Sequence, residues 1–108
     1  MAETDVKEVF EKMTGFFNKT AAQGLDAVFQ FDITGDAGGI WNVNIKDGVC
    51  EVQEGTHDAP TVTLTLSAED WLAMVNKELN PVQAFMSGQL RVSGDMMLAQ
   101  RIPELFSL

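Results

Sequence analysis

Residues 60–106 carry the strongest fold signal in this chain, and they read PTVTLTLSAEDWLAMVNKELNPVQAFMSGQLRVSGDMMLAQRIPELF. The run TVTLTL at residues 61–66 alternates threonine with aliphatic residues. A two-residue period of this kind is typical of a strand with one buried face. After it, helix-capping residues and turn glycines separate short apolar segments. We therefore expect one strand, followed by helices that surround a further strand.

The helix starts in this stretch are marked by polar capping residues. Ser67, with Asp70 three residues later, resembles a capping box and predicts a short helix that contains Trp71. Asn80 followed by Pro81 is typical of a cap and first helical residue, and this second helix is about two turns long. We expect Gly88 to close it.

The end of the stretch predicts a strand and a last helix. The sequence LRVS at residues 90–93 is typical of a strand with Leu90 and Val92 on its buried face. Gly94 and Asp95 then start a helix that runs to residue 106. Pro103 should kink or interrupt this helix, because proline lacks a backbone N–H group.

Working toward the amino terminus, the pattern predicts one helix and three strands. Apolar residues recur at helical spacing over residues 6–17, with Thr4 or Asp5 as the cap. Alternating segments at 25–34, 40–45 and 49–53 predict strands, and the glycine-rich turns at 35–39 and 46–48 join them as hairpins. The last of these strands places Cys50 and Val52 inward. The three strands should form an antiparallel meander.

The order of these elements predicts the fold class. One helix, four strands, two short helices, a fifth strand and a final helix give no alternating strand–helix repeat. This order favours an α+β fold with the helices on one face of the sheet. A length of 108 residues is typical of one compact domain, so we expect a single domain over residues 1–108.

The net charge and the cysteine count indicate which partners and which cell compartment to expect. The formal net charge is −9, which repels nucleic acid and anionic lipid headgroups, so we expect no nucleic-acid partner. An apolar, transient contact with a membrane stays open. A single cysteine allows no intrachain disulfide and indicates a reducing compartment. Because the start of the sequence also lacks the order of a signal peptide, we expect a cytoplasmic protein.

The polar residues give no argument for catalysis. His57 lies beside Asp58 in a loop, where neighbouring side chains need not face each other, and a solvated turn explains the pair. Cys50 lies on an apolar strand face, where a thiol acts as a small hydrophobic group. The glycines at 35–39 lack the ending of a phosphate-binding loop. We therefore expect no enzyme, no cofactor and no metal site.

The apolar residues of the last forty positions allow two interpretations. Four methionines fall there, Met74, Met86, Met96 and Met97. Flexible thioethers suit an adaptable pocket wall, and they equally suit an ordinary core. Composition alone favours the core, because apolar stripes usually pack against one another.

The ordered motifs of residues 60–106 resemble the C-terminal signature of the sterol carrier protein 2 family. The resemblance lies in the threonine-alternating strand, Trp71, Asn80-Pro81, and the segments AFMSG at 84–88 and LRVSGDM at 90–96. The first half fits more loosely, through residues 41–43 and 46–48. Where many relatives have glycine this chain has Asn76, which is able to adopt a left-handed turn conformation.

The resemblance implies a five-stranded, mixed, mostly antiparallel sheet whose helices enclose an apolar tunnel. It also implies non-enzymatic binding and transfer of a fatty acid, fatty acyl-CoA, sterol or phospholipid, by a monomer or homodimer. The implied ligand-binding residues are Trp71, Leu79, Phe85, Met86, Leu90, Met97, Leu98, Ile102, Leu105 and Phe106. Two alternatives stay open: a scaffold that presents a hydrophobic precursor to biosynthetic enzymes, and a dimerisation module with a filled cavity.

Overall fold

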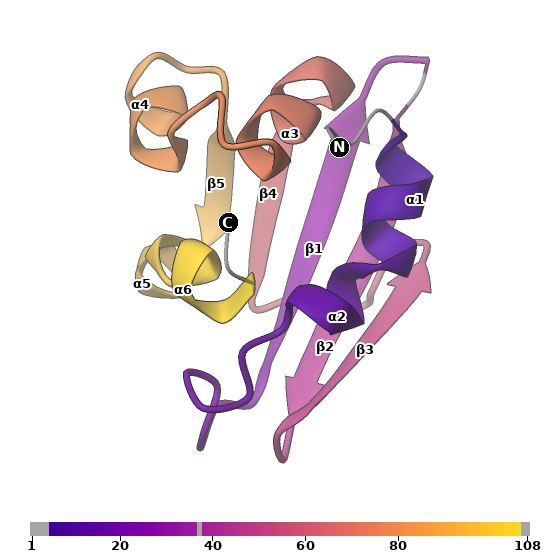
Figure 1. Cartoon of the computed structure of the whole chain (residues 1–108), viewed down its shortest axis with the longest axis vertical. Helices are drawn as coiled ribbons and strands as arrows, with labels where there is room; N and C mark the ends of the chain where they lie inside the picture. Colours follow the sequence, from indigo (N-terminus) through magenta and orange to yellow (C-terminus); the bar gives the residue numbers. More distant parts are fainter. Residues whose placement is uncertain (1–4, 37, 107–108) are drawn as a thin grey trace.

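The computed structural model of the protein describes residues 5–36 and 38–106. Its strands are β1 (Ala27–Thr34), β2 (Gly39–Lys46), β3 (Val49–Glu54), β4 (Val62–Ser67) and β5 (Arg91–Gly94). Its helices are α1 (Val6–Glu11), α2 (Met13–Phe16), α3 (Ala68–Val75), α4 (Pro81–Met86), α5 (Met96–Gln100) and α6 (Ile102–Phe106). The strands form one sheet in the order β3-β2-β1-β4-β5 (Figure 1).

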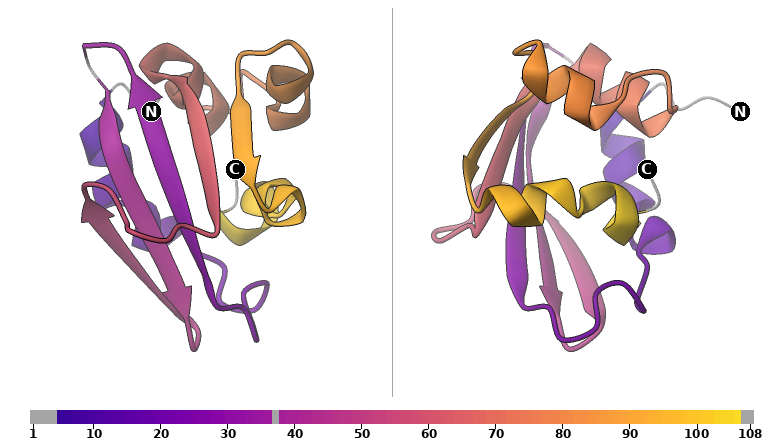
Figure 2. Two further views of the ribbon diagram at one scale, coloured as in Figure 1. Left: turned by 180° about the vertical axis from the view of Figure 1, so that it is seen from behind. Right: turned by 90° about the vertical axis from the view of Figure 1, so that its left-hand side faces the viewer.

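The sheet is mixed. Strands β1, β2 and β3 form the predicted antiparallel meander, β4 lies parallel to β1, and β5 closes the sheet antiparallel to β4. The described helices lie on one face of the sheet, and the other face is open when the molecule is seen from behind (Figure 2). The predicted α+β class and its five-stranded sheet are confirmed.

The apolar residues that alternate along the strands are buried, as the two-residue period predicts. Strand β4 buries Val62, Leu64 and Leu66 and leaves its threonines half-buried, and β1 shows the same alternation. The hairpin between β2 and β3 turns at Asp47 and Gly48, whose φ angles are 53° and 77°. Two consecutive positive φ angles give a turn whose twist matches that of the strands.

The amino-terminal helix differs from the prediction of one continuous helix. Asp5 caps α1 by accepting from the N–H groups of Lys7 and Glu8, as expected, whereas Thr4 lies outside the described residues. The helix then tightens at Lys12, whose N–H bonds to the carbonyls of both Glu8 and Val9, and α2 follows as a separate turn. Thr14 and Gly15 favour this break, because both have low helix propensity.

The caps of the second half are confirmed. Ser67 accepts from the N–H of Asp70 at 3.1 Å, and Asn80 accepts from that of Val82 at 2.8 Å. Asp95 caps α5 by accepting from the N–H of Met97 at 3.0 Å. The predicted last helix is interrupted at Arg101, two residues before Pro103, and so becomes α5 and α6.

The turn after α3 survives, but not through the residue expected. Asn76 keeps a right-handed conformation with φ −82°, and Lys77 takes the left-handed one with φ 63°. The N–H of Glu78 bonds to the carbonyl of Ala73, and that of Lys77 to the carbonyl of Met74. This is a Schellman motif, whose left-handed residue is the one after the cap.

The core lies between the sheet and the helices and is centred on aromatic rings. The ring of Phe10 from α1 is stacked between the indoles of Trp41 and Trp71, with centroid distances of 4.5 and 5.0 Å. Phe31 of β1 packs against both Phe10 and Trp71. Helices α1 and α3 are therefore held on the sheet through one aromatic cluster.

Candidate lipid-binding site

An apolar groove of about 340 Å³ lies between α4 and α5. Its sides are formed by one helix each, and its floor is formed by Leu90 and Val92 at β5. Figure 1 shows the arrangement, with α4 and α5 at opposite ends of β5. The lining residues are Pro81, Val82, Phe85, Leu90, Val92, Met96, Ala99 and Gln100. Gln100 is the one polar side chain among them, so the groove suits an apolar ligand.

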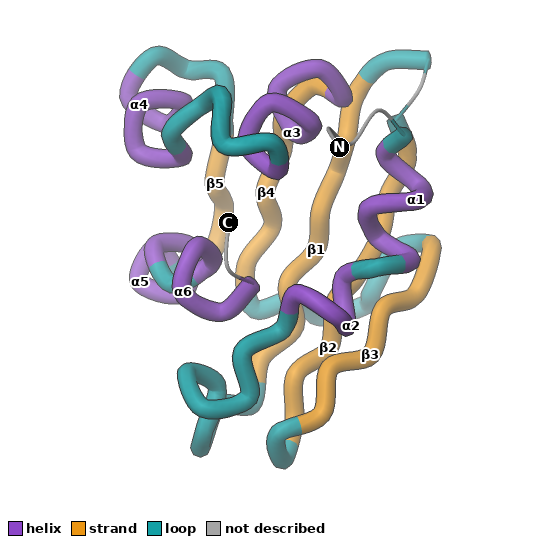
Figure 3. The backbone as a smooth tube through the Cα atoms, in the orientation of Figure 1, coloured by secondary structure: helices purple, strands orange, loops and turns teal. Residues whose placement is uncertain are grey.

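The groove exists because β5 is short and both of its ends turn into helices. Gly88 (φ 84°) ends the α4 turn before β5, and Gly94 (φ 101°) leads from β5 into α5. Figure 3 shows the loop that leads from α4 into β5, with α5 at the other end of the strand. The floor also reaches the core, because Leu90 is 5% exposed and Val92 packs against the buried cluster.

Two other hollows of the described surface are larger than the groove. They have volumes of about 440 and 550 Å³ and are lined mainly by charged and polar residues of segments 19–28 and 44–57. Size alone would favour these hollows, but the chemistry of the lining favours the groove.

The remaining polar groups have structural explanations. His57 Nδ1 accepts from the N–H of Ala59 at 3.0 Å, which fixes the imidazole in its own loop, and Asp58 is exposed. Burial raises the pKa of the Cys50 thiol from 9.0 to about 11, so it stays protonated and a poor nucleophile at neutral pH. Within residues 5–36 and 38–106, no cluster of three or more metal-ligating side chains occurs. No helix there is long and apolar enough to span a membrane.

One buried donor in the described core lacks a partner. The indole Nε1 of Trp71 is fully buried and makes no hydrogen bond. Leaving a donor of this kind unsatisfied costs about 1–3 kcal/mol. An acceptor atom on a bound ligand would remove this cost.

The sequence pattern of the SCP-2 sterol transfer family matches residues 9–107. The chain belongs to this family. Its fold agrees, since the solution structure of palmitated SCP2L2 from Aedes aegypti is 30% identical with a TM-score of 0.74. That match covers 94% of this chain and 93% of the mosquito chain. The predicted family is confirmed.

Segments similar to this chain in sequence or in fold also occur within much longer chains. Hydroxysteroid dehydrogenase-like protein 2 of Rattus norvegicus is 30% identical over 103 residues, which are 94% of this chain but 20% of the rat protein. A sec-alkylsulfatase from Pseudomonas sp. shares the fold with a TM-score of 0.79 at 17% identity, over 15% of its chain. This chain thus spans about a fifth of the rat relative. The similarity to the dehydrogenase-like proteins is confined to their SCP-2 domain.

The ten residues predicted from the SCP-2 resemblance fall into three environments. Phe85 and Leu90 line the groove. Trp71, Ile102, Leu105 and Phe106 are buried in the core, and Leu79 and Leu98 pack against it. Met86 and Met97 are 80% and 78% exposed and line no part of the groove. Their role in ligand binding stays a prediction, as does the enclosed tunnel.

Six lining residues were not among the predicted ten: Pro81, Val82, Val92, Met96, Ala99 and Gln100. A sequence signal for them exists in the helical spacing. Val82 and Phe85 lie three residues apart on α4, and Met96 and Ala99 lie three apart on α5. Each pair therefore shares one helix face. Sequence alone does not indicate that these two faces meet across β5.

Proposed function

We propose that the protein binds a lipid through its apolar chain and transfers it without chemical change. The observation that carries the proposal is the groove between α4 and α5, whose lining is almost wholly apolar and whose floor joins the core. Membership of the SCP-2 family supports lipid binding and transfer in general.

Burial of an acyl chain supplies the binding energy. Each methylene group removed from water gains ~0.8 kcal/mol, so about ten buried methylenes gain on the order of 8 kcal/mol before ordering costs. A lipid chain would enter at the groove. If α4 and α5 move apart, it could then extend past Leu90 and pack against apolar side chains of the core. Helices of five or six residues have few internal hydrogen bonds to resist such a movement.

Among the candidate lipids, we favour a fatty acid, which carries a single negative charge, or an uncharged acyl lipid. The mosquito relative, at 30% identity, was solved in a palmitated form. The net charge of −9 opposes the polyanionic headgroup of an acyl-CoA.

Native mass spectrometry with lipid extraction, followed by titration with a fluorescent fatty acid, tests this proposal. We expect a bound acyl lipid that natural fatty acids displace. Phe85→Asp should weaken binding at least tenfold, because it places a charge in the groove. Val49→Asp is the matched control, since Val49 is similarly exposed but lies on β3 at the other edge of the sheet.

An empty protein that binds no acyl probe would contradict the proposal. The two remaining interpretations would then be a scaffold for a biosynthetic enzyme and a dimerisation module with a filled cavity. Equal weakening by Phe85→Asp and Val49→Asp would place the ligand elsewhere.

A further inference from the structure

Most of the well-exposed large apolar side chains of the described chain lie on two helices that border one groove. Of the six large hydrophobic side chains that are well exposed in the described chain, five belong to α4 and α5. They are Val82 (63% exposed), Phe85 (43%), Met86 (80%), Met96 (40%) and Met97 (78%), and we call them the α4–α5 apolar surface. A large exposed apolar patch marks an interaction site more often than an isolated exposed residue does, and three of these side chains line the same groove.

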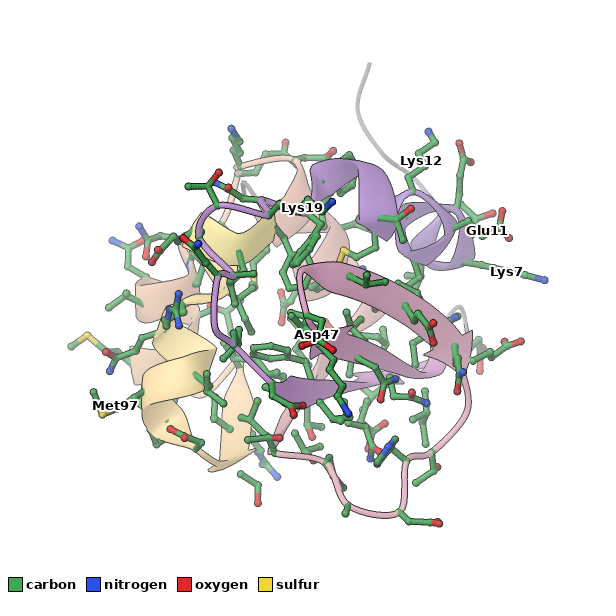
Figure 4. The ribbon with its side chains drawn as sticks, turned by 90° about the horizontal axis from the view of Figure 1, so that it is seen from below. Lys7, Glu11, Lys12, Lys19, Asp47 and Met97 are labelled. Carbon is green, nitrogen blue, oxygen red and sulfur yellow. The ribbon has the colours of Figure 1, made fainter. Side chains whose placement is uncertain are left out.

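The charge around this surface differs from that of the rest of the chain. Residues 81–100 contain one cation, Arg91, and one anion, Asp95, so the whole net charge of −9 lies outside them. The acidic Asp70, which contacts this segment, accepts a hydrogen bond from Gln89 at 3.1 Å. Figure 4 shows Met97 projecting from one side of the molecule, while Lys7, Glu11 and Lys12 project from the opposite side.

We propose that the α4–α5 apolar surface docks on the headgroup–acyl boundary of a zwitterionic lipid bilayer. The proposal rests on the proposed function, because a lipid carrier must collect its ligand from a membrane. A neutral apolar surface matches a bilayer without net charge, and the acidic remainder of the chain is repelled by anionic lipid.

A second copy of this chain or another protein would suit the α4–α5 apolar surface less well than a bilayer does. A second copy of this chain would also carry a charge of −9, which opposes association. A protein partner is usually specified by charged and hydrogen-bonding groups at the rim, and residues 81–100 offer one of each sign. Four of the five side chains are methionines or a valine on short helices, and the flexible methionines adapt readily to a fluid surface.

Docking would place the groove against the bilayer. Val82, Phe85 and Met96 belong both to the exposed surface and to the groove lining. A lipid could therefore pass from the bilayer into the groove between α4 and α5 without crossing water. The surface and the groove would then act as one device for ligand exchange.

Vesicle flotation tests this proposal with phosphatidylcholine vesicles as the probe. We expect the protein to float with them at both low and high salt, and to float less as anionic phosphatidylglycerol is added. The double variant Met86→Gln, Met97→Gln should lower the vesicle partition coefficient about tenfold, because two inserting side chains become polar. Val49→Gln, at the opposite sheet edge, should leave partitioning unchanged.

Three results would overturn the proposal: no flotation of the wild-type protein, a preference for anionic vesicles, or a concentration-dependent dimer that the double methionine variant abolishes. Titration of the wild-type protein with a fluorescent fatty acid, without vesicles, keeps the two proposals separate. Fatty-acid binding without flotation contradicts the docking surface alone. Loss of both contradicts the carrier function as well.

Discussion

Lys77 ends helix α3 in a backbone conformation that ordinarily suits glycine. Its φ angle is 63°, and its N–H and that of Glu78 close the Schellman hydrogen bonds to Met74 and Ala73. For a residue with a Cβ atom, the left-handed conformation costs roughly 1–2 kcal/mol. The motif is thus stabilised by its hydrogen bonds against a local strain at one residue.

Glycine at position 77 should relieve this strain. We expect Lys77→Gly to unfold with a free energy equal to the wild-type value or up to about 1 kcal/mol higher, since relief of strain offsets the added entropy of the unfolded chain. Urea denaturation measures the difference. In Asn76→Gly, where φ is −82°, only the entropic cost remains, and we expect a loss of about 0.5–1 kcal/mol. If Asn76→Gly were instead more stable to urea than Lys77→Gly, the assignment of Lys77 as the left-handed residue would be contradicted.

At the scale of elements, the junction of β5 with α5 depends on Gly94. Its φ angle is 101°, and a Cβ atom there would lie 2.6 Å from the Thr61 carbonyl oxygen and 3.0 Å from the Cα of Val62. The same carbonyl accepts from the N–H of Asp95 at 3.1 Å. The close contact between Gly94 and the Thr61 carbonyl therefore lies where the edge strand β5, the start of β4 and the cap of α5 meet.

An alanine at this junction should be costly. We expect Gly94→Ala to lower the free energy of unfolding by roughly 2–4 kcal/mol, because backbone strain and a steric clash add together. Gly88→Ala is the matched control: its φ is also positive, at 84°, but a Cβ there meets nothing within 4 Å. Its loss should be about 1 kcal/mol. Equal losses in thermal unfolding would show that the contact with Thr61 is unimportant.

The sequence predicted where helices start better than where a helix is interrupted. The caps Asp5, Ser67, Asn80 and Asp95 were predictable, because each side chain bonds to an N–H two or three residues away. The break at Lys12 was missed, since the apolar spacing continues through it. A periodic pattern reports which face is buried, and it does not report whether every backbone hydrogen bond is kept.

At the scale of the whole molecule, the candidate site was only partly predictable. The resemblance named Phe85 and Leu90, which line the groove, but it could not separate them from Met86 and Met97, which project into solvent. Exposure depends on which helix faces meet across β5, and that depends on contacts distant in sequence. A run of apolar residues carries no information on which of its members remain uncovered.

Hydrogen bonds between residues distant in sequence join the two ends of the chain. Arg101, between α5 and α6, donates from Nη2 to the carbonyl of Ala21, and the N–H of Asn18 donates to the carbonyl of Leu105 at 2.7 Å. These bonds tie the last two helices to the loop that follows α2. If a lipid enters when α5 moves away from α4, the Arg101 bond should resist its entry.

Removing this bond should therefore loosen the last helices. We expect Arg101→Met, which keeps an apolar stem, to lower the opening free energy of residues 96–106 by about 1–2 kcal/mol, the contribution of a charge-assisted hydrogen bond. Hydrogen exchange measures this change, and stopped-flow mixing with a fluorescent fatty acid should show faster association. Glu104→Gln is the control, because it removes only the exposed ion pair with Arg101 at 3.8 Å. Faster exchange in Arg101→Met with an unchanged association rate would show that ligand entry does not require α5 and α6 to open.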